Sequence, residues 1–201
     1  MKVWVGDALR DAGDARVSVF DHGLTVGDGV FETTKVIDGV PFALTRHLDR
    51  LSRSAAGLGL PAPDHRAVRR ATAEVIASAG HQGPLRLRIT YTGGVAPMSS
   101  ERGTGASTLI VAATPIATWA TTTSLATVPW PRNERGATAG LKTTSYAENV
   151  IALAHAKARG AAEAVFANTR GSCVRAPAAT CSSSGAESCS PPRWPPDAWP
   201  G

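Results

Sequence analysis

The residue best suited to covalent chemistry is Lys142, in the stretch "GLKTTSYAEN" that spans residues 140 to 149. The chain has four lysines against seventeen arginines, so a lysine at this place stands out from the composition. An arginine stays protonated in proteins, whereas a lysine can act as an amine nucleophile once its pKa is lowered. The stretch therefore indicates either a nucleophilic lysine or an ordinary surface lysine at the start of a helix.

Two further polar side chains lie earlier in the chain, in the stretch "HLDR" that begins at His47 and ends at Arg50. His47 lies one helical turn before Arg50 and therefore on the same face of the expected helix. From the residues alone, a solvent-facing arginine and an ordinary surface histidine are the simpler interpretations.

Hydrophobic periodicity and turn residues predict the elements that carry these side chains. The stretch "GDGVFETTKVIDGVPFAL" alternates apolar and polar residues around the turn dipeptide Asp38-Gly39, which predicts a β-hairpin. Asp64 is a suitable N-cap for a helix that Gly80 would end. The other expected elements are strands over 2–5, 15–20, 85–92 and 108–115 and a helix over 46–60. Together they predict a small N-terminal α/β domain over residues 1–115.

A second unit is expected after a linker at residues 116–123. Within residues 124–171 the pattern predicts a strand, a loop that leads to Lys142, a helix over 145–159 and a strand over 163–168. The predicted fold class is therefore α+β, with two domains.

Composition narrows the class of protein. The 201 residues are 43% hydrophobic with a mean hydropathy of -0.06, values typical of a soluble globular protein. The early charges and the lack of a long apolar run favour a cytoplasmic location. The net charge of +5 is scattered along the chain, which argues against nucleic-acid binding. Cys173, Cys181 and Cys189 match no metal or redox motif.

Two long motifs resemble the signatures of the class IV aminotransferases, which are pyridoxal-phosphate enzymes of fold type IV. The first is "VSVFDHGLTVGDGVFETTKVIDGVPFALTRHLDRLSRSAAGLGL", and the second is "GLKTTSYAENVIALAHAKARGAAEAVFANTRG". The resemblance covers residues 1–171 in order. It implies a two-domain fold with a small α/β domain and a larger β-rich domain, which is incomplete in this chain.

The resemblance also implies roles for individual residues. Lys142 would form the Schiff base with pyridoxal 5'-phosphate, and Arg50 would bind the cofactor phosphate. Tyr146 would lie near the cofactor ring or else serve in helix packing. Phe31 and Glu32 fall where the family's first domain meets the cofactor and substrate, although Glu32 suits an exposed strand position equally well. No metal is expected, and the family form implies a homodimer that acts on a small amino substrate.

The resemblance leaves the reaction open among several activities. D-amino-acid transaminases carry an Arg-Gly pair directly after the strand that here reads "RITYTGG", and this chain has Thr92-Gly93-Gly94 there. Of the two remaining interpretations we prefer 4-amino-4-deoxychorismate lyase, which eliminates pyruvate to give 4-aminobenzoate for folate. The alternative within the family is a branched-chain amino-acid transaminase. The alternatives of another class are a non-catalytic basic binding protein and an inactive pseudogene product.

The composition changes after Gly171, because residues 172–201 contain no Leu, Ile, Phe or Met. Such a segment has little to bury and predicts a disordered tail. A G/C-rich back-translation of the tail, read from the third base of the Gly171 codon, gives "QLCEGTGSNVFVVR". This reading supplies the acidic residue, Gly-rich loop and strand of the resembled family. We therefore expect a frameshift near Gly171 that impairs the enzyme.

Overall fold

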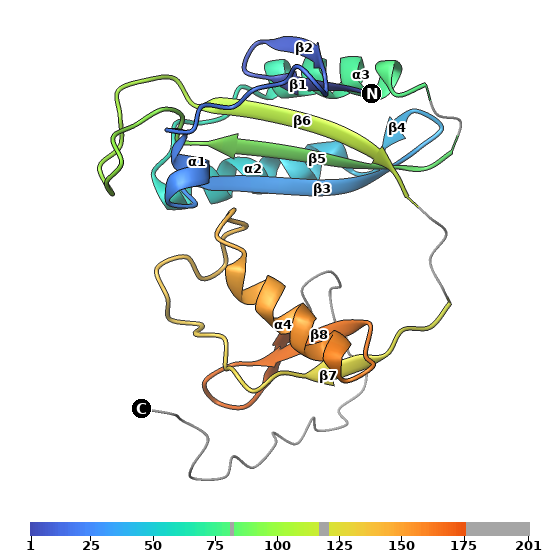
Figure 1. The fold of residues 1–201 in the computed structure, drawn as a ribbon, viewed down its shortest axis with the longest axis vertical. Coiled ribbons are helices and arrows are strands. Elements are labelled where there is room, and N and C mark those ends of the chain that lie inside the picture. The colour runs from blue at the N-terminus through green and yellow to red at the C-terminus, as the bar shows by residue number, and fades with distance from the viewer. Residues whose placement is uncertain (81–82, 117–120, 176–201) are drawn as a thin grey trace. The chain divides into compact units, whose positions relative to one another are not determined.

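The chain divides into two compact units, each of which is described by itself. The computed structural model describes residues 1–80, 83–116 and 121–175. Of these, the first unit contains residues 1–116 and Gly140–Ser145, and the second contains residues 121–139 and 146–175. The helices and strands of both units are labelled in Figure 1.

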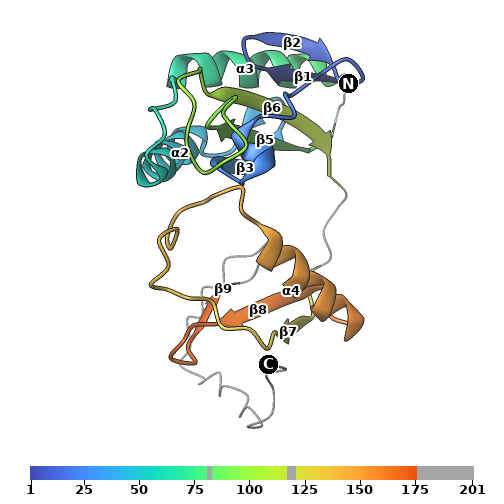
Figure 2. The ribbon, with the colours of Figure 1, turned by 60° about the vertical axis from the view of Figure 1, so that its left-hand side comes forward.

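The first unit is built on a six-stranded antiparallel sheet with the strand order β2-β1-β6-β5-β3-β4 (Figure 1). Its strands are β1 (Lys2–Val5), β2 (Ala8–Asp11), β3 (Gly29–Ile37), β4 (Val40–Pro41), β5 (Leu85–Thr92) and β6 (Thr108–Pro115). Three helices accompany them: α1 (His22–Thr25), α2 (Leu44–Leu58) and α3 (His65–Ser78). α2 packs on β3, and α3 packs on β6 and β1 (Figure 2).

One face of this sheet forms the core, and exposed arginines of β5 lie on the other face. On β5, Leu85, Leu87 and Ile89 are buried, whereas Arg86 and Arg88 between them are exposed. The buried strand residues pack with Leu48 and Leu51 of α2 and with α3 in a single cluster. The predicted alternation over 85–92 thus assigns β5 side chains to the correct faces, because successive side chains of a strand point in opposite directions.

Local chemistry accounts for the start of α3 and the end of α2. The Asp64 side chain accepts a hydrogen bond of 2.8 Å from the backbone N–H of Arg66, so the predicted N-cap of α3 is confirmed. α2 ends at Gly59, whose φ of 74° is in the left-handed region that glycine adopts without a Cβ penalty. The predicted hairpin turn is confirmed at Asp38 and Gly39, which both have positive φ.

The strand predicted over residues 15–20 is wrong. β2 follows β1 in the chain and pairs with it. Residues 15–20 form an irregular segment that leads to α1. In this segment the Ser18 carbonyl accepts from the N–H of Asp21, and the Ser18 hydroxyl accepts from the N–H of Phe20. Such local side-chain bonds compete with a β-ladder and turn the chain instead.

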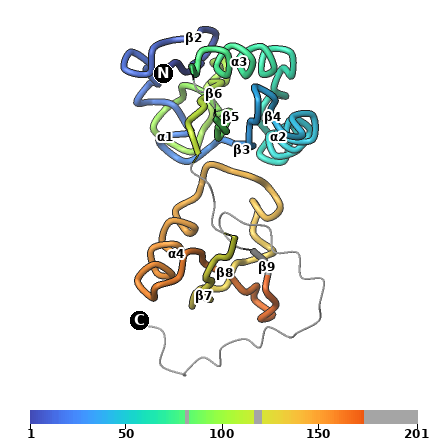
Figure 3. The backbone as a smooth tube through the Cα atoms, turned by 90° about the vertical axis from the view of Figure 1, so that its right-hand side faces the viewer, coloured from blue at the N-terminus to red at the C-terminus, as the bar shows by residue number. Residues whose placement is uncertain are grey.

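The second unit contains a three-stranded sheet and one helix. β7 (Leu125–Thr127) runs parallel to β8 (Glu163–Ala167), and β9 (Cys173–Arg175) is antiparallel to β8. In Figure 3 β8 lies between β7 and β9. The helix α4 (Ala147–Ala158) connects the two parallel strands and packs on β8. The small core of this unit consists of Val128, Ala152, Ala156, Ala161, Ala164 and Phe166.

The observed division differs from the expected boundaries in two places. Gly140–Ser145, expected within a unit over 124–171, belongs to the first unit because it pairs with β3. β9 continues the regular structure past Gly171 as far as Arg175. The rest of the expected tail, residues 176–201, and part of the expected linker, residues 117–120, lie outside the described residues. Within the described part of the chain, no helix is long and apolar enough to cross a membrane.

Candidate active site

The segment that carries Lys142 is held along the edge of β3. The backbone N–H of Phe31 donates to the Lys142 carbonyl at 3.0 Å, and the N–H of Thr144 donates to the Gly29 carbonyl at 2.8 Å. Val30 and Thr143 form an antiparallel bridge between these bonds. Because β5 occupies the other side of β3 at this end, residues 142–144 act as a short additional strand.

Helix α2 holds the same segment from a second direction. The backbone N–H of Lys142 donates to the hydroxyl of Ser54 at 3.1 Å, and Ser54 is buried. Leu141 packs on Gly57, one turn further along α2. The backbone of Lys142 is therefore fixed by β3 and by α2, while its side chain projects from this anchored position.

The Lys142 side chain reaches the ring of Phe31. Its Nζ atom lies 4.2 Å from the ring centroid, and Cζ of Arg88 lies 3.8 Å from the same centroid. Phe31 is 4% exposed and lies on the opposite face of β3 from Val30, which belongs to the core. The face of the sheet away from α2 and α3 thus brings an aromatic ring, an amine and a guanidinium together.

Next to this group, Glu32 binds two side chains of α2. Arg50 donates from Nε to Oε1 and from Nη2 to Oε2, both at 2.6 Å. His47 Nδ1 lies 2.7 Å from Oε2 of the same carboxylate. This bonding raises the pKa of the Arg50 guanidinium above its ordinary value, with the Glu32 hydrogen bond as the main cause. Glu32 is completely buried, so its exposed-strand interpretation is wrong.

Arg50 and Lys142 are linked through one face of α2. Ser54, which binds the Lys142 backbone, follows Arg50 by four residues and so lies one helical turn away on the same face. The first unit contains four of the five predicted site residues in two groups, Phe31 with Lys142 and Glu32 with Arg50. Tyr146 belongs to the second unit, where it immediately precedes α4.

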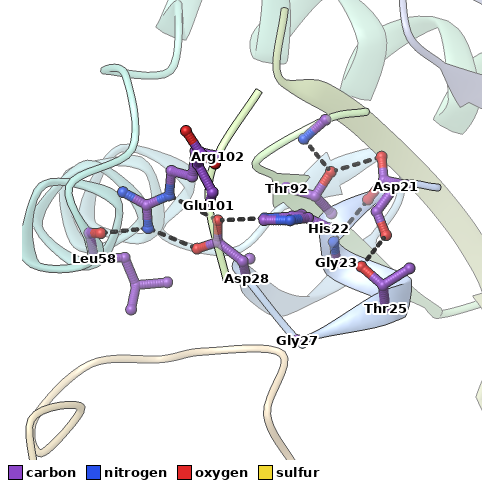
Figure 4. Close-up of polar contacts among 12 residues, drawn as sticks. Asp21, His22, Gly23, Thr25, Gly27, Asp28, Leu58, Thr92, Glu101 and Arg102 are labelled. Atoms are coloured by element: carbon purple, nitrogen blue, oxygen red, sulfur yellow. Dashed lines mark hydrogen bonds and ion pairs between the residues drawn. The ribbon is translucent and has the colours of Figure 1, made fainter. Parts of the chain in front are cut away.

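A second polar cluster, which we call the loop clasp, consists of Asp28, Arg102 and the last carbonyls of α2 (Figure 4). Arg102 donates to both oxygens of Asp28 at 2.7 Å and to the carbonyls of Leu58 and Gly59 at 2.6 and 2.9 Å. His22 Nδ1 lies 3.4 Å from Asp28. The hydrogen bonds from Arg102 lower the pKa of Asp28 below its ordinary value. The clasp fastens the loop between β5 and β6 to α2.

Asp21 organises the neighbouring strand ends and has a structural role. It is 1% exposed and accepts hydrogen bonds from the N–H of Gly23 and from the hydroxyls of Thr92 and Thr108. Figure 4 shows Asp21 and Thr92 beside the clasp. Sequence reasoning missed Asp21, Ser54 and the clasp, because their partners are distant in the chain. It preferred ordinary helix surface to a role in supporting Arg50 for His47, but His47 binds the buried Glu32, which also binds Arg50.

Residues 29–186 match the family described as amino-transferase class IV, and the chain belongs to that family. It is 34% identical over 167 residues to a bifunctional aminodeoxychorismate lyase / D-amino acid transaminase from Mycobacterium tuberculosis. That match covers 77% of this chain and 56% of the relative, so the chain spans about half the length of this curated relative.

Solved structures show the same fold. A fold IV-transaminase from Curtobacterium pusillum matches 85% of this chain and 59% of its own, with a TM-score of 0.74 and 33% identity. A branched-chain aminotransferase from Thermoproteus uzoniensis matches 88% of this chain and 63% of its own, with a TM-score of 0.76 and 28% identity. The chain is thus a partial fold-type IV structure.

Class IV aminotransferases use pyridoxal 5'-phosphate, and the side chains of the first unit fit this cofactor. An aldehyde needs a primary amine, which Lys142 supplies above an aromatic ring. A guanidinium held in place suits a phosphate, and Glu32 holds Arg50 in this way. Within the described residues, no group of three or more His, Cys, Asp and Glu side chains could hold a metal.

Proposed function

We propose that the protein acts on amino substrates with pyridoxal 5'-phosphate, which Lys142 binds covalently and Arg50 binds through the phosphate. The observation that carries this proposal is that Arg50 and Ser54, which binds the Lys142 backbone, lie on the same face of α2. Lys142 is fixed at its backbone, and its amine lies against the Phe31 ring. A fixed main chain with a long side chain lets the amine reach a reacting carbon repeatedly from one direction.

When bound, the cofactor supplies an electron sink for bonds at the substrate carbon. Lys142 takes up and returns a proton at Nζ during the reaction. Phe31 supplies a flat apolar surface, and Arg50 holds the phosphate. Tyr146 acts at the cofactor ring in this proposal.

For the reaction, we place 4-amino-4-deoxychorismate lyase first. The M. tuberculosis relative carries that activity in its name, together with D-amino acid transamination. The loop clasp argues against D-amino acid transamination by this chain. Arg102 is the arginine nearest after the Gly93-Gly94 pair, and its donors are directed to Asp28, Leu58 and Gly59. A guanidinium held in this way is not available for a substrate carboxylate.

The second candidate is a branched-chain amino-acid transaminase. The similarity to the Thermoproteus uzoniensis structure, whose title gives that activity and norvaline, favours it. The two candidates differ in the fate of the amino group, because the lyase releases pyruvate and the transaminase passes the amino group to 2-oxoglutarate.

The partner that fits the proposal is a second copy of this chain. Two segments of the first unit carry large apolar side chains that are exposed: Val19, Phe20, Leu24 and Val26 in one, and Val95 and Met98 in the other. The two segments that carry them are bridged at Asp21 and Val95. Exposed apolar side chains on two bridged segments favour an interface with a second copy. Sedimentation of the purified protein tests this expectation, and a monomer at micromolar concentration would contradict it.

Covalent binding is tested by mixing the protein with pyridoxal 5'-phosphate, reducing with borohydride and mapping the adduct by mass spectrometry. We expect the adduct on Lys142 and its loss in Lys142→Arg, which keeps the charge but has no reactive amine. Lys157→Arg, on α4, is the matched control and should keep the adduct. An adduct at another lysine, or none, would contradict the proposal.

The reaction is tested by a coupled pyruvate assay on aminodeoxychorismate beside a leucine–oxoglutarate assay. Pyruvate release without glutamate formation supports the lyase. Glutamate formation without pyruvate release would reverse the order of the two candidates. Salt-sensitive nucleic-acid binding without cofactor uptake would support a non-catalytic basic protein instead.

A further inference from the structure

Glu32 is a fully buried carboxylate in the face of β3 that otherwise builds the hydrophobic core. Its relative exposure is 0%, and Val30 and Val36 on the same face belong to the core cluster. Removing a charge from water is unfavourable unless the charge is paired and hydrogen-bonded. Packing alone therefore does not explain a carboxylate at position 32. The side chains that bind Glu32 indicate its role.

Both oxygens of Glu32 are used by side chains of α2. Oε1 accepts from Nε of Arg50, and Oε2 accepts from Nη2 of Arg50 and faces Nδ1 of His47. An ionised carboxylate only accepts hydrogen bonds, so His47 donates through Nδ1. The three N···O distances are 2.6 to 2.7 Å, and short N–H···O distances are typical of hydrogen bonds that a charge assists.

The two hydrogen bonds from Arg50 to Glu32 determine which edge of the guanidinium faces outward. Glu32 engages Nε and Nη2, so Nη1 lies outside these two bonds. The Arg50 side chain is nevertheless 46% exposed, whereas Glu32 is not exposed at all. Arg50 is thus held from the protein side in one orientation and keeps an accessible edge for an anion.

We infer that Glu32 is a positioning residue, which together with His47 orders Arg50 in advance for the phosphate of pyridoxal 5'-phosphate. This inference rests on the proposed function, because it takes Arg50 as the phosphate-binding residue. A long side chain loses rotamer freedom when it binds a ligand, and a side chain that is already fixed loses less. Glu32 therefore strengthens phosphate binding through Arg50 without touching the phosphate.

The charge of Glu32 has the opposite effect on a phosphate. A carboxylate near the site repels a dianion, so a simple electrostatic role predicts that loss of the charge strengthens binding. The carboxylate lies behind the guanidinium, and His47 donates to it from the same helix. We therefore expect the positioning effect to exceed the repulsion. The sign of a single substitution distinguishes the two effects.

The experiment compares pyridoxal 5'-phosphate with pyridoxal, which has the aldehyde but no phosphate. Absorbance titrations give the dissociation constant of each compound for the unmodified protein, Glu32→Gln and the exposed-acid control Glu74→Gln. We expect Glu32→Gln to weaken binding of the phosphorylated compound about tenfold, since charge-assisted hydrogen bonds are lost. Binding of pyridoxal should stay within about twofold, and Glu74→Gln should change neither constant.

Three outcomes would overturn the inference. Unchanged or tighter binding of pyridoxal 5'-phosphate by Glu32→Gln would show that Glu32 does not position Arg50 for the phosphate. Equal weakening for both compounds would indicate a merely structural role. In an Arg50→Gln background, Glu32→Gln should have no further effect on the phosphorylated compound, and a further loss would show that Glu32 does not act through Arg50.

A separate measurement distinguishes failure of this inference from failure of the proposed function. If the unmodified protein forms no adduct with pyridoxal 5'-phosphate, the proposed function fails. Inorganic phosphate then serves as the probe, and the Nε–H resonance of Arg50 is followed by nitrogen-edited NMR. We expect phosphate to shift this resonance in the unmodified protein and to shift it less in Glu32→Gln. Equal shifts in both proteins would overturn the positioning role.

Discussion

Leu141 lies directly against Gly57 of α2, and a Cβ atom built at position 57 would stand 2.5 Å from Cδ2 of Leu141. A side chain at position 57 would therefore require the Leu141 side chain to shift. The contact lies one helical turn from Ser54, which binds the backbone of Lys142. The residue before the candidate nucleophile is therefore packed on the helix that also carries Arg50.

Gly57→Ala is expected to destabilise the protein by about 1 kcal/mol. The alanine gains up to ~1 kcal/mol of helix propensity, but overpacking against Leu141 costs about 1–3 kcal/mol. Urea unfolding measures the stability, and the yield of the borohydride-trapped Lys142 adduct should fall with it. Adding Leu141→Ala removes the clash and serves as the control. A more stable Gly57→Ala protein with full adduct yield would contradict the close contact.

Asp28→Asn is expected to destabilise the protein in a pH-dependent way. Arg102 lowers the pKa of Asp28 from its ordinary 3.8, so the folded state favours the charged carboxylate. The stabilisation is complete above about pH 4 and is lost as the pH falls through the lowered value. At pH 7 we expect a loss of about 1 kcal/mol, because Arg102 is 38% exposed and solvent screens the pair.

Urea unfolding midpoints at neutral and acidic pH measure this effect for Asp28→Asn and for Asp14→Asn, an exposed aspartate. The difference between Asp28→Asn and the unmodified protein should shrink as the solution becomes more acidic than about pH 4. Asp14→Asn should behave like the unmodified protein at both values. A difference that is independent of pH would show that the charge of Asp28 is not the cause.

Thr169→Val is expected to raise the pKa of Glu134. The hydroxyl of Thr169 donates to Glu134 Oε1 at 2.7 Å, and this bond is the main cause that lowers the pKa of Glu134 to about 2. Carbon-detected NMR of the Glu134 carboxyl group measures the shift. Arg170→Gln is the matched comparison and should raise the pKa less, because the charge of Arg170 is the smallest contribution. A larger effect of Arg170→Gln would reverse the assigned causes.

Leu51→Ala is expected to cost about 2–5 kcal/mol of unfolding free energy. Leu51 is 0% exposed and packs in the main core cluster between α2 and the sheet. Val40→Ala, at a position that is 67% exposed on β4, should change stability by less than about 0.5 kcal/mol. Denaturant unfolding of both variants checks the contrast, and equal losses would place the core elsewhere.

The sequence predicted well those elements whose signals are local. The strands over 85–92 and 108–115 are β5 and β6 with the same bounds. Side-chain alternation predicted the first and a continuous apolar run predicted the second. The prediction for residues 15–20 failed although the alternation was present. A strand needs a partner ladder, and here Ser18 supplies local hydrogen bonds that turn the chain.

By itself, the sequence determined the α+β class, the N-cap at Asp64, and the motifs that carry Lys142 and Arg50. These features depend on residues within a few positions of one another, whose spacing restricts the backbone directly. Only the tertiary structure decided that Glu32 is buried between His47 and Arg50, and that Gly140–Ser145 joins the first unit. Both outcomes require residues distant in the chain to meet, because burial and pairing energies arise only when the sheet and α2 have packed together.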